Sequence, residues 1–321
     1  MPREGVEWKS HETMLSFEEI LRIAGIMAGL GIRKIRVTGG EPLVRRGLAS
    51  FLEKLKALPG IEKITLTTNG LLLGAYLEEA ENRPGSLPDG INISLDALDP
   101  LRLERITRRE NLNPAEILSL ADRLIEKRVP VKLNCVPVRS YNEEEILPLA
   151  ALAKTRNMAV RFIELMPMGQ ASALEPVPGA EIASMLEKAY GPLAPVSAAQ
   201  AEFSLQAEFS PQTAESGSGG PAVYYSLPGF TGIIGFINPV SCGFCESCNR
   251  LRLTSDGILK PCLSHNLGLD LRELCRSGSS DEEIARAIAG IAAQKPGTHN
   301  LSGIYGAAGT HNRDGMFRIG G

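Results

Sequence analysis

The residues best suited to chemistry lie in one stretch near the C-terminal end of the chain. Four of the six cysteines fall within 21 residues, and two arginines follow the third of these four. Thiolates are ligands for soft metals, and guanidinium groups bind phosphate or carboxylate oxygens in pairs. The stretch therefore predicts a metal centre that meets an anionic ligand. Its members are Cys242, Cys245, Cys248, Arg250, Arg252 and Cys262.

Three interpretations of these cysteines are open at this point. A tetrahedral zinc site uses four thiolates at about these spacings. An iron–sulfur cluster uses three or four, and close x2 spacings are common in cluster-binding runs. Unligated buried thiols are the third option, which a Cys-x2-Cys-x2-Cys run disfavours. Spacing alone does not separate iron from zinc, and the isolated Cys135 and Cys275 are predicted to be ordinary core or surface thiols.

The two arginines of this stretch alternate about Leu251. On an extended backbone, Arg250 and Arg252 would project to the same side of the strand, which suits the oxygens of a phosphate. A solvated surface pair is the alternative. Next to a predicted metal site, the phosphate-binding interpretation is favoured.

The overall composition is that of a globular protein of one or two domains, with 43% apolar and 22% charged residues among 321. The formal net charge of -3 leaves no basic footprint, so nucleic acid is not an expected partner. No apolar run reaches the roughly 18 residues needed to span a bilayer, and no signal peptide is visible. Clustered cysteines without a secretory signal indicate a reducing compartment, so we expect a cytoplasmic protein.

The elements that must position this stretch alternate between strands and helices. Ser16 and Glu19 have capping-box spacing before a first helix, and Ser280 and Glu283 have the same spacing before a last one. Five alternations of strand and helix favour right-handed βα units and a parallel sheet, either as a partly closed barrel or as an open sheet. The predicted strands are 34–38, 63–68, 91–95, 131–136 and 160–165, and the intervening helices lie near 71–82, 114–128 and 142–156, the last begun by Asn142 with Glu145.

The βα series opens with a helix that has no strand before it, so we expect an N-terminal strand and its loop to be missing. The composition changes after residue 190, where residues 191–222 are rich in Pro, Ala, Ser and Gly. The predicted domains are a βα barrel over 1–190, a flexible linker over 191–222, and a C-terminal region over 223–321 that carries the cysteine stretch.

Polar residues gather where the predicted strands end. In parallel βα folds, ligands bind at the C-terminal ends of the strands. A small set of polar and cationic side chains at these ends suits a nucleotide or another phosphorylated ligand, although any one of them could merely cap a strand. The set is Arg36, Thr38, Thr67, Thr68, Asn92, Ser94, Lys132, Asn134, Arg161 and Glu164.

The turn after the first predicted strand reads Gly39-Gly40-Glu41-Pro42. Two glycines let the backbone approach a ligand closely, and Glu41 could accept hydrogen bonds from an ammonium group. An ordinary βα turn is the alternative.

Together these pieces resemble one family over essentially the whole chain, the GTP 3',8-cyclases of molybdenum cofactor biosynthesis, which are radical S-adenosylmethionine enzymes. The combination is highly specific, whereas the Gly-Gly-Glu-Pro turn alone indicates only the wider superfamily. The matching stretches are 35–46, 66–70, 92–96, 161–166, 244–252 and the terminal Gly320-Gly321.

The resemblance implies an incomplete TIM-type βα barrel with an iron–sulfur-binding C-terminal extension. It implies a lyase that converts GTP to 3',8-cyclo-7,8-dihydro-GTP, the first step of molybdenum cofactor biosynthesis. A first [4Fe–4S] cluster would cleave S-adenosylmethionine, and the resulting radical would take a hydrogen from the ribose of GTP. A second [4Fe–4S] cluster, at the cysteine stretch, would hold the GTP base through an open iron site.

The resemblance also assigns residues by motif position. Gly40, Ser94 and Met166 are implied to contact S-adenosylmethionine. The implied GTP contacts are Arg36, Thr67, Lys132, Arg250 and Arg252, and the implied ligands of the second cluster are Cys245, Cys248 and Cys262. Gly320 and Gly321 are implied to reach into the active site and assist radical initiation. The implied partners are GTP, an electron donor, cyclic pyranopterin monophosphate synthase as the receiver of the product, and a second copy in a homodimer.

Two features depart from the family pattern. The family carries a Cys-x3-Cys-x2-Cys loop after its first strand, but this chain has no cysteine before Cys135. We therefore expect an N-terminally truncated chain or a misplaced start codon, and a chain that, as written, does not generate the radical. The second departure is Cys242, a fourth thiol near the three matching ones. It is expected not to ligate, because the other three spacings already match the family.

Two other functions are weighed against the cyclase. A radical S-adenosylmethionine enzyme that modifies a peptide or cofactor would share the cluster chemistry but would not bind GTP. A zinc-stabilised binding protein without catalysis would unfold with a chelator and ignore S-adenosylmethionine.

Overall fold

The protein is built on an eight-stranded sheet, described by a computed structural model for residues 10–197, 200–201, 221–242 and 245–298. The strand order is β1-β2-β3-β4-β5-β8-β7-β6, with parallel pairs from β1 to β8 and antiparallel pairs for β7 and β6. The strands are β1 (Lys34–Val37), β2 (Lys63–Thr68), β3 (Ile91–Ser94), β4 (Val131–Cys135), β5 (Ala159–Ile163), β6 (Ala194–Val196), β7 (Val223–Ser226) and β8 (Ile233–Ile237).

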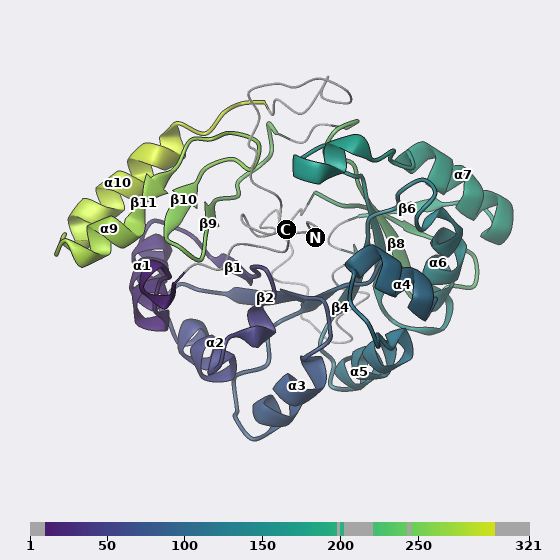
Figure 1. Ribbon diagram of the computed structural model, residues 1–321, viewed down its shortest axis with the longest axis horizontal. Coiled ribbons are helices and arrows are strands. Elements are labelled where there is room, and N and C mark those ends of the chain that lie inside the picture. The colour runs from purple at the N-terminus through teal and green to yellow at the C-terminus, as the bar shows by residue number, and fades with distance from the viewer. Residues whose placement is uncertain (1–9, 198–199, 202–220, 243–244, 299–321) are drawn as a thin grey trace.

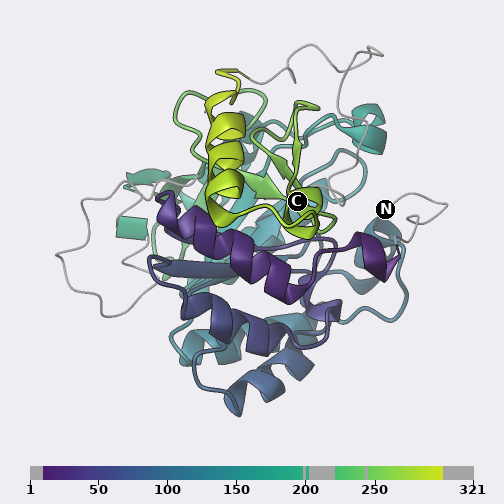
Figure 2. The same ribbon diagram turned by 90° about the vertical axis from the view of Figure 1, so that its left-hand side faces the viewer.

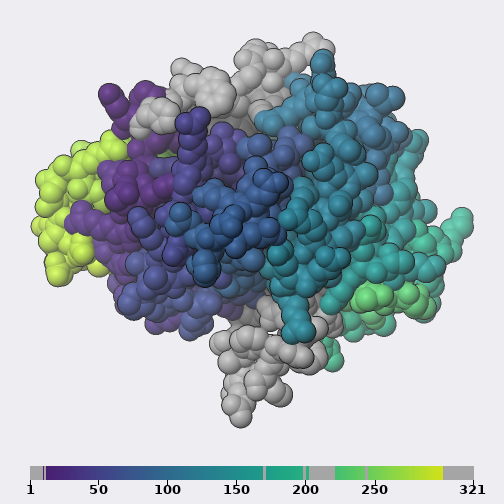
Figure 3. All heavy atoms as spheres, turned by 90° about the horizontal axis from the view of Figure 1, so that it is seen from below, coloured from purple at the N-terminus to yellow at the C-terminus, as the bar shows by residue number. Residues whose placement is uncertain are grey.

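Helices cover the outer side of this curved sheet, so that the sheet and its helices form most of a ring (Figure 1). Seen from below, side chains of the N-terminal and middle parts of the chain form most of the surface (Figure 3). The helices are α1 (Phe17–Gly29), α2 (Leu48–Lys56), α3 (Leu73–Glu81), α4 (Pro100–Thr107), α5 (Pro114–Glu126), α6 (Ile146–Thr155) and α7 (Gly179–Tyr190), with short 3-10 helices η1 (His11–Thr13), η2 (Pro42–Val44), η3 (Glu143–Glu145) and η4 (Gly169–Ala173).

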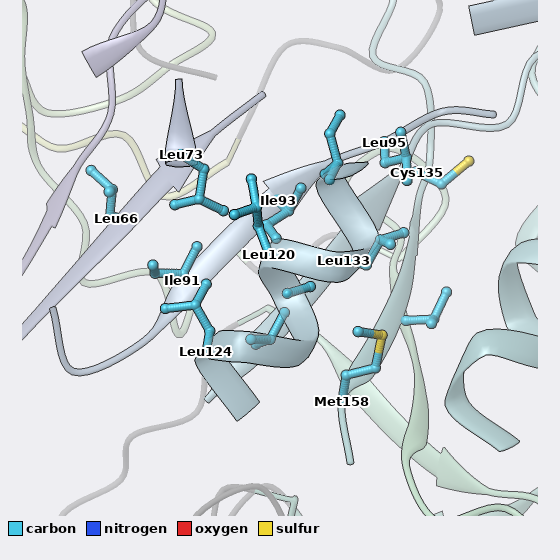
Figure 4. Close-up of a cluster of buried hydrophobic side chains, with 14 of the residues drawn as sticks. Leu66, Leu73, Ile91, Ile93, Leu95, Leu120, Leu124, Leu133, Cys135 and Met158 are labelled. Atoms are coloured by element: carbon cyan, nitrogen blue, oxygen red, sulfur yellow. The ribbon is translucent and has the colours of Figure 1, made fainter. Parts of the chain in front are cut away.

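The apolar core lies between the sheet and the helices. Successive residues of a strand point to opposite faces, so alternate residues of β2, β3 and β4 pack against the helices. Figure 4 shows Leu66, Ile93 and Leu133 of these strands against Leu120 and Leu124 of α5, and all five belong to one buried cluster. The intervening strand residues face the concave side of the sheet, and that face is predominantly polar.

A second unit completes the ring beside α1. It contains a small antiparallel sheet of β9 (Arg252–Leu253), β10 (Ile258–Lys260) and β11 (Leu269–Asp270), with α9 (Leu271–Arg276) and α10 (Asp281–Ala293). Figures 1 and 2 show α10 next to α1. A separate apolar cluster joins the two, in which Ile23 of α1 packs with Ile284 and Ile288 of α10 and with Leu259 of β10. This C-terminal unit, called the cysteine region where its cysteines are discussed, is therefore packed against α1.

The predicted α/β fold class is confirmed: the curved sheet of βα units, called the barrel below, is not closed within the described residues and carries a C-terminal extension. Both predicted capping boxes are present, at Ser16 with Glu19 and at Ser280 with Glu283. The sequence missed α4. The predicted helix start at Asn142 is confirmed in position, because Asn142 directly precedes η3 and α6. Its side chain does not cap the helix: the amide oxygen accepts from Val138 N, and the amide nitrogen donates to the carbonyls of Asp96 and Val136. A buried amide that satisfies a loop is unavailable to cap a helix.

The sheet continues through the predicted domain boundary near residue 190, because β7 and β8 pair with each other and β8 pairs with β5. The division of the chain into separate domains over 1–190 and 223–321 stays a prediction. Within the predicted flexible linker over 191–222, Ala194–Val196 form β6, whereas residues 198–199 and 202–220 lie outside the described residues. Among the residues that the structure describes, no helix has the length and apolar character to cross a membrane.

Candidate active site

The register of the sheet brings polar residues of neighbouring strands into one band on its concave face. Thr67 of β2 pairs with Asn92 of β3, and Asn92 pairs with Lys132 of β4. Further along, Asn134 of β4 pairs with Arg161 of β5. Directly paired residues share a face of the sheet. The predicted strand-end residues are therefore brought together by the sheet itself.

Arg161 is the anchor of this band. It is only 5% exposed, yet its guanidinium is held at both ends: Nε donates to Asn134 Oδ1 at 2.8 Å and Nη2 donates to Asn92 Oδ1 at 2.7 Å. The amide of Asn92 in turn donates to Thr67 Oγ1 at 3.1 Å. Burial lowers the pKa of Arg161, and the Tyr224 hydroxyl opposes that shift through a hydrogen bond. The cation is thus fixed in place before any ligand arrives.

Room for Arg161 is made by a glycine on the next strand. Arg161 pairs with Gly235 of β8, and Gly235 pairs with Tyr224 of β7. A Cβ at Gly235 would lie 2.9 Å from Arg161 Cγ and 2.9 Å from Tyr224 Cε1. Any larger residue there would displace one of the two side chains. Gly235 and Tyr224 were not predicted as site residues, although reading the alternation of 223–226 as a strand would have placed Tyr224 on this face.

Four arginines crowd together at this end of the sheet. Arg36 of β1 is exposed, yet its pKa is lowered to about 10, first by the surrounding protein and then by the charges of Arg161, Arg250 and Arg252. The pKa of Arg252 is also lowered to about 10, by burial and then by Arg250. The charges of these arginines therefore act on one another over short range. Mutual repulsion of four cations favours the binding of a polyanion among them.

The Gly-Gly-Glu-Pro turn has a structural role for its carboxylate. Glu41 Oε1 accepts from Thr68 Oγ1 at 2.7 Å and from Leu43 N at 3.1 Å, while Oε2 accepts from Asn69 N at 2.7 Å. These bonds tie the turn after β1 to the end of β2. Within the described residues, a Cβ at Gly40 would meet no atom within 4 Å, so packing does not dictate the glycine there. That freedom is compatible with close approach of a ligand to the backbone of Gly40.

The other two residues implied for S-adenosylmethionine lie at the same end of the sheet. Ser94 is the last residue of β3 and is exposed, and Met166 follows β5 and is half-buried. The five implied GTP residues divide between two elements: Arg36, Thr67 and Lys132 on the large sheet, and Arg250 and Arg252 in the C-terminal unit. Thr67 is 9% exposed and its hydroxyl accepts from Asn92, so it helps to hold Asn92 in place.

The loop that leads into the cysteines is fixed to β5 by a carboxylate. Glu164 Oε2 accepts from Val240 N at 2.8 Å and from Ser241 N at 2.9 Å. Cys242 N then donates to Asn238 O at 3.1 Å. A single residue after β5 thereby joins the barrel to the start of the cysteine stretch.

The three family-matched cysteines lie where their thiols are partly shielded. Cys245, Cys248 and Cys262 are free and half-buried, whereas Cys242 is free and exposed. Burial raises the pKa of Cys248, but hydrogen bonding to Arg250 and the charges of Arg250 and Lys295 outweigh it, so the pKa is lowered overall. Cys262 Sγ lies 3.3 Å from Ser264 Oγ. The surroundings of Cys248 therefore favour its thiolate form.

The fit of this stretch to an iron–sulfur cluster rests on donor chemistry. Within the described part of the chain, no three Cys, His, Asp or Glu side chains stand together as a finished metal site. The thiols of Cys248 and Cys262 nevertheless both lie near enough to Arg252 to oppose the lowering of its pKa. Soft, half-buried thiols next to fixed cations fit a cluster whose net charge is negative. Gly320 and Gly321 lie outside the described residues.

The chain offers no comparable thiolate set near its other end. Its first 134 residues contain no cysteine, and Cys135 is fully buried with its pKa raised by burial. The neighbouring Asp96 also has its pKa raised, to about 6, by burial, although it accepts from Val136 N at 2.8 Å. These residues do not fit a second cluster.

Comparisons with known proteins cover nearly the entire chain. Residues 3–153 match the Radical SAM superfamily and residues 158–301 match Molybdenum Cofactor Synthesis C. A GTP 3',8-cyclase of Moorella thermoacetica is 41% identical over 306 residues, which cover 94% of this chain and 87% of that protein. One of Pelotomaculum thermopropionicum is 40% identical over 329 residues, covering 100% and 92%.

Among solved structures the similarity is distant. A radical SAM methyltransferase from Sphaerobacter thermophilus matches with a TM-score of 0.40 and 20% identity, covering 50% of this chain and 49% of that one.

Proposed function

The chain belongs to the GTP 3',8-cyclase family of radical S-adenosylmethionine enzymes, and we propose that it binds the triphosphate of GTP among these four arginines. The reaction is the conversion of GTP to 3',8-cyclo-7,8-dihydro-GTP in molybdenum cofactor biosynthesis. The observation that carries the binding proposal is the proximity of Arg36, Arg161, Arg250 and Arg252, and the pKa values of Arg36 and Arg252, each lowered to about 10 in part by other arginines, agree with it. A triphosphate relieves this repulsion.

The arginines come from two parts of the fold, which gives the site two sides. Arg36 and Arg161 are attached to the barrel, and Arg250 and Arg252 to the C-terminal unit. A triphosphate held between them orients the rest of the nucleotide relative to both units. Arg161 extends the set that the motifs imply, because it contributes to the same crowding of charge around Arg36.

Family membership implies a [4Fe–4S] cluster and S-adenosylmethionine as cofactors. We assign Cys245, Cys248 and Cys262 to a [4Fe–4S] cluster at the C-terminal site, which would supply an iron with an open position for the guanine base. Its supports are the half-burial of the three thiols and the lowered pKa of Cys248. Gly40, Ser94 and Met166 are assigned to S-adenosylmethionine, on their common place at the C-terminal ends of β1, β3 and β5.

The radical-generating cluster has no ligand set among the first 134 residues, so no step of the reaction is assigned to this chain through it. The remaining proposals concern partners. The family reaction supports an electron donor and product transfer to cyclic pyranopterin monophosphate synthase, and family resemblance supports a homodimer. The clustered cysteines support a cytoplasmic location. The Gly320-Gly321 tail is assigned to the same active site on its motif alone.

The test is GTP binding by isothermal titration calorimetry, which requires no turnover. Arg250→Ala and Arg252→Ala each remove charge-assisted hydrogen bonds, so each is expected to weaken GTP binding about 10-fold to 100-fold. Arg286→Ala is the matched control, since Arg286 is an exposed arginine of α10 in the same unit. It should bind GTP like the wild type.

Two results would contradict the proposal separately. A wild-type chain that does not bind GTP excludes the cyclase and favours a radical enzyme acting on a peptide or another cofactor. Anaerobic reconstitution should give about four irons per chain with iron–sulfur absorbance. Zinc without that absorbance would overturn the cluster and favour the zinc-stabilised binding protein.

A further inference from the structure

Lys295 bridges the two segments that carry the cysteines. Beyond α10, its Nζ donates to Arg250 O at 2.6 Å and to Pro261 O at 2.7 Å. Arg250 is two residues after Cys248, and Pro261 immediately precedes Cys262. One ammonium group thus contacts both segments that carry the proposed ligands.

The strand pairing next to this contact shows why such a residue is needed. β9 and β10 are joined by two pairs, Leu253 with Leu259 and Arg252 with Lys260. Among the described residues, no further pair of β9 and β10 follows Arg252–Lys260 toward the cysteines. The carbonyls of Arg250 and Pro261 lie just past the end of the ladder, and there Lys295 takes over the function of the strand pairing.

The position of Lys295 itself is well determined. It follows α10, whose Ile284, Ile288 and Ile291 are buried in the apolar cluster shared with α1 and β10. Its backbone N–H donates to Ala292 O at 3.1 Å, which continues the last turn of the helix. The ammonium is therefore held by the packed core and is not merely a flexible surface charge.

We infer that Lys295 is a positioning residue that holds Cys248 and Arg250 at a set distance from Cys262. The inference rests on the proposed cluster and GTP site. Two bonds to backbone carbonyls fix the separation of the ligand-bearing segments, while the positive charge lies beside thiolates. The same contact fixes the backbone of Arg250, so loading of the cluster and binding of the triphosphate depend on one lysine.

The test compares three variants of the full chain after anaerobic reconstitution. Lys295→Met keeps the length of the side chain but removes both bonds and the charge. Lys295→Arg keeps the charge and can still donate to two carbonyls. Lys188→Met is the control, because Lys188 also lies at the C-terminal end of a helix, α7, but is exposed and far in sequence from the cysteines.

Lys295→Met should release iron to a chelator about 10-fold to 100-fold faster than the wild type, the range for residues that orient metal ligands. Its remaining cluster should have a more negative midpoint potential, since a neighbouring cation stabilises the reduced form. GTP affinity of the iron-free chain should also fall. Lys295→Arg should restore most of the iron retention, and Lys188→Met should match the wild type in all three measurements.

The outcomes separate this inference from the function on which it rests. If the wild type takes up iron and binds GTP, and Lys295→Met does both equally well, the role of Lys295 is overturned while the proposed function stands. If the wild type takes up no iron, the cluster itself is overturned and the inference with it. A variant of lower stability whose remaining cluster has an unchanged potential would show that Lys295 is merely structural.

Discussion

The concave face of the barrel and the cysteine region position their functional groups in different ways. On the barrel, register and a buried chain of hydrogen bonds place Arg161, with Asn92 and Asn134 as fixed partners. In the cysteine region, the strands are two or three residues long, and long-range contacts from Glu164 and Lys295 replace the missing ladder. The barrel is organised by its backbone, and the cysteine region by individual side chains.

This difference has a consequence for mutation. A regular sheet spreads the positioning of a group over many backbone hydrogen bonds, so removing one side chain removes one group. A loop that is held by a few side-chain contacts, such as those of Glu164 and Lys295, depends on each of them. Removing one such contact therefore displaces several groups together. Variants of the concave face of the barrel should therefore change GTP binding alone. Variants of Glu164 or Lys295 should change GTP binding and iron retention together.

The largest effect is expected for Arg161→Met. This variant removes the buried cation of the barrel and leaves Asn92 and Asn134 without their donor, so GTP affinity should fall about 100-fold. Iron retention should be unchanged, because the side-chain hydrogen bonds of Arg161 to Asn92 and Asn134 lie within the barrel. Arg161→Lys should not rescue binding, since one ammonium does not reproduce the fork to two amides.

The control for this experiment is Arg156→Met. Arg156 pairs with Asp122 on the outer side of the barrel at 2.8 Å, and its loss should leave GTP affinity within about 2-fold of the wild type. Equal losses in both variants would mean that charge at any position, and not the concave face, governs binding.

A smaller but broader effect is expected for Glu164→Ala. The variant leaves the N–H groups of Val240 and Ser241 without their acceptor, which corresponds to about 1–3 kcal/mol and hence roughly 10-fold in GTP affinity. Iron should also be lost faster to a chelator, because the same contact fixes the entry to the cysteine stretch.

Glu187→Ala is the matched control for Glu164, as it removes only one exposed contact to Leu193 N at 3.3 Å. If Glu164→Ala weakens GTP binding without affecting iron retention, the distinction between an ordered barrel and a braced cysteine region is wrong at this point.

Asp96 shows that the barrel also contains an unfavourable group. Its pKa is raised to about 6 by burial, from an ordinary value of 3.8. The folded state therefore binds this proton more tightly than the unfolded state does. Stability falls as pH rises from about 4 to about 6, and the penalty is fully present above that window. Asp96→Asn keeps an acceptor for Val136 N and should raise the free energy of unfolding at pH 7 by about 1–3 kcal/mol.

The measurement is chemical denaturation at pH 4 and at pH 7. The gain from Asp96→Asn should appear at pH 7 and nearly vanish at pH 4. Asp99→Asn is the control: Asp99 caps α4 through Arg102 N at 2.7 Å, and asparagine caps equally well, so no comparable gain is expected. A gain of the same size at both pH values would exclude ionisation as the cause.

The sequence predicted the barrel better than it predicted the cysteine region. Period-2 alternation and capping boxes are local signals, so the strands and the helices of Ser16 and Ser280 could be located without tertiary information. The helix start at Asn142 was located correctly, but the partners of its side chain, Asp96 and Val138, could not be predicted because they depend on how two loops meet. The helix α4 was missed because Asp99 and Pro100 mark its start only weakly in a short polar segment.

The same reasoning separates the site residues that the motifs found from those that they missed. Arg250, Arg252 and the cysteines lie close together in sequence, so their types and spacing were sufficient. Lys295 is 45 residues from Arg250, and its role follows only from two backbone carbonyls that carry no sequence signal. The roles of Tyr224 and Gly235 follow from the pairing of β7 with β8. Composition had suggested a domain boundary before these strands, so the pairing was not predicted.

The smallest effect is expected where the cysteine region is attached to α1 by exposed charges. Glu19 accepts from Arg276 at 2.7 Å, and this hydrogen bond is the first cause of its lowered pKa. A carboxylate with a depressed folded pKa stabilises the protein above its ordinary pKa, and the contribution is lost as pH falls through the folded value. Glu19→Gln should therefore lower the Tm by about 1–2 °C at pH 7 and low salt, and by less at 1 M salt or below pH 3.

The apolar cluster beneath this pair explains why the effect should be so small. Ile23, Ile284 and Ile288 remain packed when the charge is removed, and their burial does not depend on salt or pH. Ile288→Ala is the reference variant, with an expected loss of about 2–5 kcal/mol. If Glu19→Gln destabilised the protein as much as Ile288→Ala, the cysteine region would be held to α1 by charge and not by its core, and iron retention would become strongly salt-dependent.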